Sequence, residues 1–506
     1  MGEPMPAHTW VLQPGSSFFK SQLERWTAEQ PPGSKPVLRV PLGSSEDVPH
    51  ARTAIRYIYT GELGTSSAAD IQGARRLACY LGVEGAAEAC SMALVDLARP
   101  DGQHPLDGIA DLFTCRHLLP ASDEDPRAAS LLDDLRSACQ LQLMAYKGAG
   151  TEFSAPCGAK VPLGGLLAWA FPDAPSVLSN RGSKGRVLFL SASSLEALLS
   201  SDAFATDNEA SVLLLLAEWL NANRVATALS ADVCPRLCRF IRLCQLSSVY
   251  LHGLLHLLPW FPLTAPELPL LRQAATLPEG AARDHLLAYV ADGGFDWPPA
   301  WTSGAARPHA RADAGEPYIW SIAQEDLSKS LAANEIASIQ STLTDSCSAL
   351  VANGFEVWPM LQLHRDHDAA GVYLELCIPA ALRAQNVPPL LGVSSPGACR
   401  LMVLKWTEGG DGPDAEPAYC HECDGPDDVL GIGRAWGRAD ALPLPEPVLP
   451  EDGTAPDPLA RWKPYLHAGR LRGILTWLGP EEEEPEEEEE EAAAEEGQEE
   501  AVEATA

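Results

Sequence analysis

The sequence predicts a multidomain α+β protein, in which an N-terminal α/β unit, an all-α middle and an antiparallel β-sandwich precede a disordered acidic tail. Two observations lead to this fold class. Apolar residues recur at helical spacing up to about residue 302, and their period becomes two from about residue 316. Residues 481–506 then hold 15 glutamates and no basic residue. A chain of 506 residues is long enough for about three domains.

The composition excludes several classes of protein. The formal charge is −33, and without residues 481–506 the chain still has 54 acidic residues against 36 basic ones. This balance argues against nucleic acid and anionic membranes as partners, because both favour clustered Lys and Arg. No apolar run reaches the roughly 18 residues of a membrane span. The 13 cysteines are odd in number and scattered among apolar residues, which is typical of reduced thiols in a cytoplasmic or nuclear protein.

Residues 1–97 make up the predicted α/β unit. A strand candidate, KPVLRVPL (residues 35–42), follows the helical pattern SSFFKSQLERW and precedes VPHARTAIRYIY and ADIQGARRLACYLGV. Thr60-Gly61 is a break signal between the last two patterns. We therefore expect a helix that ends at this turn and a new helical pair after it.

Residues 103–302 predict an all-α block. Leu-rich segments such as SLEALLSS, EASVLLLLAEWLNAN, RLCRFIRLCQL and VYLHGLLHLL are separated by Pro, Gly, Asp and Asn. Residues 303–315, SGAARPHARADAG, contain almost no large apolar side chain and predict a linker.

Residues 316–479 predict the β-sandwich. The segments YIWSI, FEVWPMLQLH, GVYLELCI, CRLMVLKW and GRLRGILTWL alternate or are continuously apolar over strand lengths, with polar or Gly/Pro turns between them. Residues 480–506 cannot bury enough apolar surface to offset the entropy of ordering, so a disordered tail is expected.

Four segments in order resemble a BTB (POZ) domain over roughly residues 6–97. They are AHTWVLQPGSSFFKSQLERW, VLRVPL, AIRYIYTGEL and ARRLACYLGVEGAAEACSMAL. In that family a His-x-x-x-Leu segment precedes a Ser-x-x-Phe helix, and a Tyr-x-Tyr-Thr-Gly turn sits between the two final helical pairs. The family's leading strands, which help to form a homodimer, are missing before His8. The resemblance therefore leaves homodimerisation open, and we expect a monomer or a weak dimer.

Two further segments extend the resemblance. LEALLSSDAFATDNEASVLLLLAEWL followed by LCRFIRLCQLSSVYL is similar to a BACK domain, with Glu209 and Trp219 at expected positions. The C-terminal strands, with AWGRADAL near their end, resemble a MATH (TRAF-like) domain. The combination resembles substrate adaptors of cullin-RING ubiquitin ligases, with the familiar MATH-then-BTB order reversed. This implies a cullin scaffold and an unknown protein substrate as partners; the alternative is a BTB scaffold or transcriptional co-regulator without a role in ubiquitination.

The resemblance also implies candidate binding residues. The cullin-facing set would be Phe18, Phe19, Leu23, Trp26 and Glu29, although a helix with this apolar spacing usually points most of its apolar residues into the protein core. The family's hydrophobic-x-Glu triplet reads Thr27-Ala28-Glu29 here.

Trp436, in the Trp-Gly pair of AWGRADAL, is the candidate for the substrate groove. The other interpretation of this tryptophan is packing in the core of the sandwich.

No motif predicts catalysis, a cofactor or a metal. Gly-x-Ser-x-Gly, P-loop, His-Glu-x-x-His and dinucleotide fingerprints are absent from the sequence. Cys420 and Cys423 have the two-residue gap that can place both thiolates on one zinc ion, which needs four ligands. The one other pair nearby is His364 and His367, in or beside a predicted strand, so we do not expect a zinc site. We therefore expect a protein that is not an enzyme.

Overall fold

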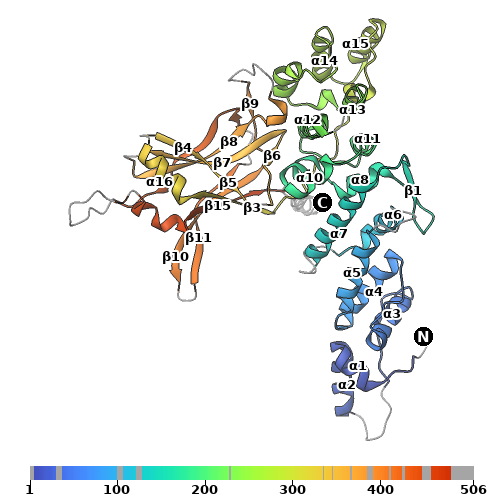
Figure 1. Cartoon of the computed structure of the whole chain (residues 1–506). Coiled ribbons are helices and arrows are strands. Elements are labelled where there is room, and N and C mark those ends of the chain that lie inside the picture. The colour runs from blue at the N-terminus through green and yellow to red at the C-terminus, as the bar shows by residue number, and fades with distance from the viewer. Residues whose placement is uncertain are drawn as a thin grey trace, which may run out of the picture.

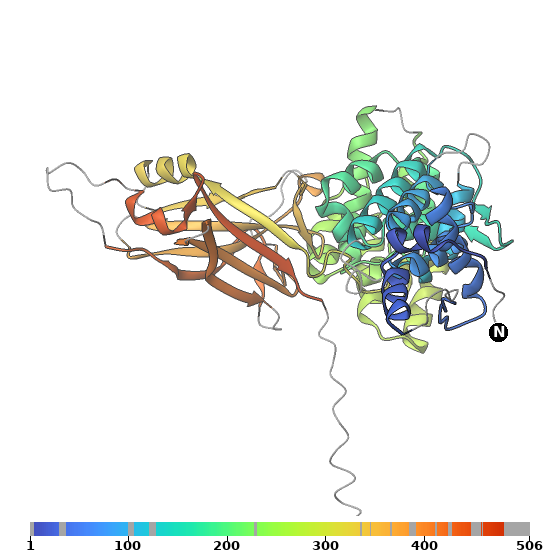
Figure 2. The same ribbon diagram turned by 90° about the horizontal axis from the view of Figure 1, so that it is seen from below.

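The computed structural model describes residues 5–29, 37–99, 106–120, 128–226, 230–333, 336–344, 346–364, 367–383, 391–409, 412–423, 428–446, 457 and 459–479. Helices form a column that begins near the N-terminus and ends at α15, and a β-rich unit projects from its side (Figures 1 and 2). The chain thus combines helical and sheet regions, as the sequence predicts. None of the described helices is long and apolar enough to cross a membrane.

The N-terminal unit consists of helices in its described part. These are α1 (Thr9–Gly15), α2 (Ser17–Glu29), α3 (Asp47–Thr60), α4 (Ala68–Tyr80) and α5 (Ala86–Leu97). Helix α3 ends as predicted, because Gly61 takes a left-handed conformation (φ 69°) and its N–H bonds to the Tyr57 carbonyl.

The prediction of a strand at residues 35–42 is wrong for its described part, residues 37–42. No strand lies between residues 37 and 99, so this segment has no ladder to join. The Gln22 side chain takes that role instead: its Nε2 donates to the Arg39 carbonyl at 2.7 Å, and its Oε1 accepts from the Arg39 N–H at 3.3 Å. Leu38 and Val40 pack against the small core of this unit. The described part of the unit is therefore α-helical rather than α/β.

The middle region is mainly helical. Its elements are α6 (Asp107–Thr114), η1 (Arg116–Leu118), α7 (Ala128–Ala145), β1 (Glu152–Ser154), β2 (Lys160–Pro162), α8 (Leu163–Ala170), α9 (Ala174–Ser179), α10 (Arg181–Leu188), α11 (Ala192–Ser200), α12 (Glu209–Ala226), α13 (Val233–Cys238), η2 (Leu243–Gln245), η3 (Val249–Leu254), η4 (Leu255–Leu257), α14 (Glu267–Thr276), α15 (Ala281–Asp292) and η5 (Pro299–Thr302).

Two details correct the all-α prediction. β1 and β2 form a short antiparallel hairpin. The segment RLCRFIRLCQL is not one helix: α13 ends at Cys238, and the Arg242 N–H donates to the Glu209 carboxylate at 2.9 Å instead of to a helical carbonyl. The next segment forms a π-helical turn, η3, which places Tyr250 in the interior.

The described part of the C-terminal unit contains two large antiparallel sheets and a short antiparallel pair, β9 with β12. Its elements are β3 (Pro317–Ala323), α16 (Gln324–Ala333), β4 (Ile336–Gln340), β5 (Thr342–Leu343), β6 (Leu350–Ala352), β7 (Phe355–His364), β8 (Ala369–Cys377), η6 (Ala380–Leu382), β9 (Val393–Ser394), β10 (Cys399–Gly409), β11 (Gly412–Cys423), β12 (Leu430–Gly431), β13 (Ala435–Pro443), η7 (Ala460–Tyr465), β14 (Leu466–His467) and β15 (Arg470–Trp477). One sheet has the order β11-β10-β15-β3-β5, with β14 beside β15. The other has the order β13-β8-β7-β4, with β6 beside β7. Strands β3, β7, β8, β10, β13 and β15 cover the predicted segments.

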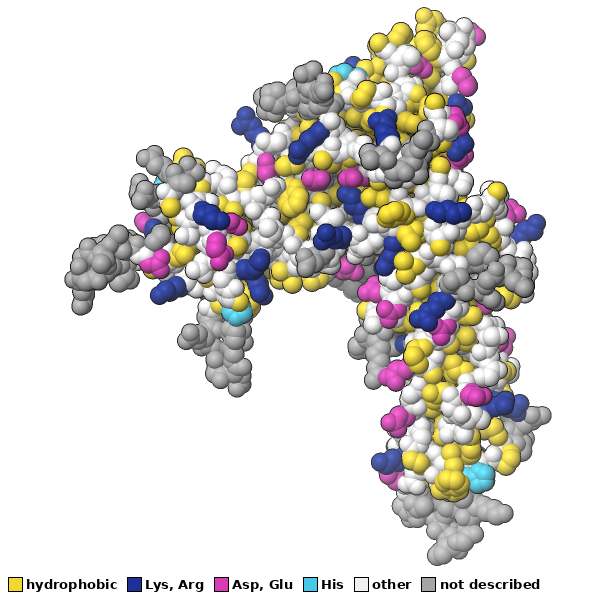
Figure 3. Space-filling model, viewed as in Figure 1, with side chains coloured by type: hydrophobic (Ala, Val, Ile, Leu, Met, Phe, Trp, Pro, Cys, Tyr) yellow, Lys and Arg dark blue, Asp and Glu magenta, His cyan; other side chains and the backbone are white. Residues whose placement is uncertain are grey.

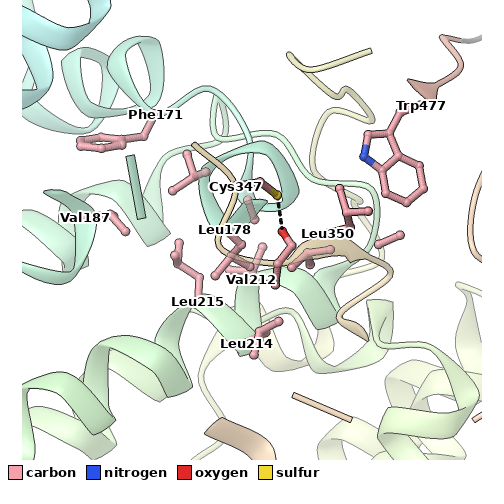
Figure 4. Packing of buried hydrophobic residues seen from close by; sticks show 14 of the residues in the cluster. Phe171, Leu178, Val187, Val212, Leu214, Leu215, Cys347, Leu350 and Trp477 are labelled. Atoms are coloured by element: carbon pink, nitrogen blue, oxygen red, sulfur yellow. Dashed lines mark hydrogen bonds between the residues drawn. The ribbon is translucent and has the colours of Figure 1, made fainter. Parts of the chain in front are cut away.

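One hydrophobic core runs through the helical middle and into the sheets. Figure 4 shows helical residues such as Leu178 and Val212 packed near Cys347 and Leu350 of the C-terminal unit, and all four are buried. A smaller core, with Leu12, Phe19 and Leu81 among its residues, holds α1 to α4 together.

Residues 303–315 connect the two units, and the buried Arg307 and Asp313 anchor this mostly exposed segment. The Arg307 side chain is fully buried and pairs with Glu209 at 2.9 Å, and it also donates to the carbonyls of Leu199 and Phe240. Arg311 forms a bidentate pair with Asp313, with both N–O distances 3.0 Å. The sequence predicted a linker because the segment has few apolar side chains. In the structure, buried charged side chains hold the segment in place instead.

The tip of the β6–β7 hairpin lies inside this junction. Asn353 and Gly354 form a two-residue turn with positive φ (51° and 81°). Their N–H groups donate to the Asp207 carboxylate and the Ser211 hydroxyl at 2.6 and 2.9 Å. The Tyr250 hydroxyl donates to the Gly354 carbonyl. The C-terminal unit is thus held to the helical column by buried polar contacts as well as by the core.

Candidate functional site

The predicted cullin-facing residues do not share one exposed surface. Phe19 and Leu23 are buried, at 2 % and 5 % exposure, and Phe19 belongs to the small N-terminal core. Phe18 is half-buried between Phe19 and Tyr80, with ring centroids 5.5 and 5.6 Å away. The side chains of Trp26 and Glu29 lie outside the described part of the chain.

Trp436 lies on β13, at the open end between the two sheets. It is half-buried, it is paired in register with the buried Leu374, and its ring centroid is 4.9 Å from that of His421 on β11. Tyr419 packs beside His421. The Tyr419 hydroxyl and His421 Nε2 are buried and have no hydrogen-bond partner among the described residues. Trp436 therefore packs at the rim of the core.

A second surface is the outer face of the β13-β8-β7-β4 sheet. Outward residues alternate along each strand with buried ones, as the half-buried Trp358, Met360, Tyr373 and Glu375 alternate with Val357, Leu361, Val372 and Leu374. The register sets Trp358 opposite Glu375, and Met360 opposite Tyr373. Two rows of large side chains thus cross the middle of this sheet. We call this surface the outer sheet face.

Small residues border the outer sheet face on one side. Strand β13 places Ala435 opposite Glu375 and Gly437 opposite Tyr373. A Cβ at Gly437 would stand 2.0 Å from the Val372 carbonyl oxygen, so only glycine allows this approach of the two strands. Strand β13 ends its sheet, and within the described residues no strand pairs with its outer edge. Its unpaired backbone groups can therefore accept an added strand.

Charged side chains border the outer sheet face where it meets the helical column. Glu356 lies on β7 next to the Lys184–Glu218 pair, whose N–O distance is 2.8 Å. Burial raises the pKa of Glu356 above its ordinary value. Burial and the nearby Glu375 raise the pKa of the Cys377 thiol to about 12, so this thiol stays protonated at neutral pH. Figure 3 shows acidic and basic side chains side by side at the junction of the two units.

The spacing of Cys420 and Cys423 does not produce a shared metal site. Both lie on β11, where residues three apart point to opposite faces. Cys420 is accordingly exposed, and Cys423 is buried opposite Cys399. Within the described residues, no group of three or more His, Cys, Asp or Glu side chains could hold a metal ion.

A groove of about 1070 Å³ lies between α5 and α7 in the helical column. Met92, Val95 and Leu141 line it, together with the acids Glu88, Asp96 and Asp134. Met92 and Leu141 are exposed. None of the predicted site residues lines this groove.

The geometry favours binding over catalysis on the outer sheet face. Aromatic and long apolar side chains beside an open edge suit an extended peptide, because the edge supplies main-chain hydrogen bonds and the face supplies side-chain contacts. Sequence reasoning singled out Trp436 but missed Trp358, Tyr373 and Glu375. These residues come from two strands, and only the register of the sheet brings them together.

One segment of the chain is similar to a known family. Residues 184–256 match the family model BACK (BTB And C-terminal Kelch), which contains the segments that resemble this domain. The match supports a protein of the BTB/BACK type. A search of curated proteins finds no match for the chain.

Proposed function

We propose that this protein is a substrate-recruiting adaptor of a cullin-RING ubiquitin ligase, with no catalytic activity of its own. The N-terminal helices, which resemble a BTB domain, would dock on the cullin scaffold. The C-terminal sheets, which resemble a MATH domain, would hold a segment of the substrate on the outer sheet face. The BACK match lies between these two parts and supports this arrangement. The cytosol or the nucleus would be the compartment.

One observation carries the proposal: an open sheet face is fixed to the BACK-matching helices. Arg307 and the tip at Asn353-Gly354 join the two units through buried contacts. An adaptor has to hold its substrate at a defined distance from the ubiquitin-charged enzyme, and a rigid junction provides this geometry. A flexible linker would spread the substrate over many positions.

Affinity capture from a reducing cell extract tests the proposal. The full-length chain should retain a cullin together with other proteins, identified by mass spectrometry. Met360→Glu with Tyr373→Ala should release those other proteins and keep the cullin, because the changed side chains lie on the outer sheet face. Met92→Glu, a change at an exposed position on α5, serves as the matched control for the loss of an apolar side chain.

The second candidate is a scaffold or transcriptional co-regulator without a role in ubiquitination. The burial of Phe19 and Leu23 favours it, since these residues are not available as anchors for a cullin. In the capture experiment this function predicts retained proteins that depend on the outer sheet face, with no cullin among them. Absence of a cullin under conditions that capture other partners would therefore replace the first candidate with the second.

A further inference from the structure

The outer sheet face carries an acidic group beside an aromatic ring. Trp358 and Glu375 are directly opposite each other on β7 and β8, and the Cβ atoms of such cross-strand pairs are about 4.5–5.5 Å apart. The Trp358 Nε1 donates to the Glu356 carboxylate at 3.4 Å, which turns the edge of the indole toward Glu356. A cation on this surface can therefore meet an indole ring and a carboxylate together.

The charges near the Glu375 carboxylate do not fully neutralise it. The charged groups that act on the neighbouring Glu356 and Cys377 side chains are the carboxylates of Glu218, Glu356 and Glu375 and the basic groups of Lys184 and Arg383. Lys184 is paired with Glu218, and the Arg383 Nε donates to the Ile378 carbonyl at 3.4 Å. No ion pair between described residues includes Glu375. The surface can thus accept one more positive charge.

A peptide that lies along β13 on the outer sheet face would have its side chains beside this pair. Ala435 and Gly437 are the β13 residues beside Glu375 and Tyr373, and their small size leaves the way across the strand open. Alternate residues of an extended peptide lie about 7 Å apart on one face. The Met360–Tyr373 row and the Trp358–Glu375 row are also two residues apart along each strand. Two alternate side chains of one peptide would therefore match the two rows.

We infer that Trp358 and Glu375 form a subsite for a Lys or Arg side chain of a bound peptide, placed two residues from a large apolar side chain that rests on Met360 and Tyr373. The inference rests on the proposed function and specifies its substrate class. The cation gains both a cation–π contact and a carboxylate partner. Acidic or phosphorylated segments are disfavoured by the same carboxylates, and the chain's own glutamate-rich residues 481–506 are disfavoured with them.

Synthetic peptides provide the test. The probe is a set of 11-residue peptides with Phe at the centre, in which the residue two positions before or after it is Lys, Arg, Gln or Glu. Binding to the full-length protein is measured by fluorescence polarisation. We expect Lys or Arg peptides to bind about tenfold more tightly than the Gln peptides, and Glu peptides to bind most weakly.

Two variants assign the preference to the subsite. Glu375→Gln keeps the size of the side chain and should reduce the advantage of Lys and Arg to about twofold or less. Glu325→Gln removes an acid on α16 away from this face and should leave the preference unchanged. Trp358→Leu should lower the affinity for the basic peptides and leave the Gln peptides nearly unaffected.

The outcomes separate this inference from the function on which it rests. Peptides that bind through Phe with no preference for a base, or a preference that survives Glu375→Gln, would overturn the subsite and leave the peptide-binding face in place. If no peptide of the set binds and proteins captured from extract are insensitive to Met360→Glu with Tyr373→Ala, both the subsite and the substrate-binding role of the face are wrong.

Discussion

The two ends of the helical column are joined to their neighbours by different chemistry. At the N-terminal junction, α4 and α5 pack on α6 and α7 through apolar residues such as Ile71, Leu94 and Leu135. A buried polar contact there joins the Ala68 N–H to the Asp111 carboxylate, at 2.8 Å. At the C-terminal junction, by contrast, Arg307 and Arg311 lie among buried acids.

This difference matters because apolar and ionic contacts constrain orientation differently. Hydrophobic contact is not directional, so stacked helices tolerate small shifts, and the N-terminal junction also leaves the groove beside Met92 open. A buried ion pair tolerates little displacement, since each unpaired charge carries a large desolvation cost. We conclude that the C-terminal junction fixes the direction of the outer sheet face, while the N-terminal junction mainly contributes stability.

The largest expected effect comes from Arg307→Met. This change leaves the Glu209 carboxylate buried without its partner and removes donors from the carbonyls of Leu199 and Phe240. The free energy of unfolding should fall by about 3–5 kcal/mol, measured by urea denaturation. Arg99→Met, which breaks an exposed pair with Asp96, is the control and should cost under about 1 kcal/mol. Equal losses for both variants would contradict the comparison.

The next effect concerns the hairpin tip. Gly354→Ala puts a methyl group 2.7 Å from both the Ala210 Cβ and the Tyr250 hydroxyl, at a backbone φ of 81°. We expect a loss of about 2–4 kcal/mol, the sum of left-handed strain and overpacking. Gly433→Ala has a similar φ of 73° with nothing within 4 Å, so it measures the strain alone and should cost about 1–2 kcal/mol. The difference between the two variants reports how tightly the junction encloses the tip.

The same contrast explains what sequence reasoning could predict. Strands with long apolar alternation, such as β7 and β15, were predicted nearly to the residue, because their pattern reflects local burial. Strand β11 was missed, since Pro413 and Pro417 and its few apolar residues do not suggest a strand. The prediction of a strand at residues 35–42 was wrong for the opposite reason. The local pattern was suitable, but no partner strand lies beside the described part of this segment.

The site shows the same limit. Trp436 was accessible to sequence reasoning through its motif, whereas the Trp358–Glu375 pair depends on the register between β7 and β8. Arg307 was read as a linker residue, because its partner Glu209 is 98 positions away in the sequence. The junction and the candidate subsite both form through contacts between segments that are distant in the sequence. Such contacts cannot be predicted from composition or from local patterns.

The pH dependence of stability provides a separate test of the buried charges at the C-terminal junction. Asp173 caps α9, accepts from the Ala312 N–H at 2.8 Å, and is near Asp313 and Arg311 in the C-terminal junction. Burial raises its pKa from 3.8 to about 6. The folded state therefore binds this proton more tightly than the unfolded state does, so the contribution of Asp173 to stability is full below about pH 4 and is lost as the pH rises through 6.

Denaturation at several pH values between 4 and 7 tests this sign. Asp173→Asn should remove a slope of at most about 1.4 kcal/mol per pH unit within that window, so the free energy of unfolding of the wild type minus that of the variant should fall as the pH rises. A difference that grows with pH would mean that Arg311 stabilises the Asp173 carboxylate more than burial destabilises it, and that the pKa of Asp173 is lowered rather than raised on folding.

The smallest effect is expected on α5, at the N-terminal junction. Met92 is 64 % exposed and lines the groove, whereas Leu94, two residues later, is fully buried. Met92→Ala should therefore change the free energy of unfolding by less than about 0.5 kcal/mol, and Leu94→Ala should cost about 2–5 kcal/mol. Both substitutions keep a good helix former, so the contrast isolates burial from helix propensity. If Met92→Ala proved as costly as Leu94→Ala, the groove would be closed by packing in solution, and the N-terminal junction would be as tightly constrained as the C-terminal one.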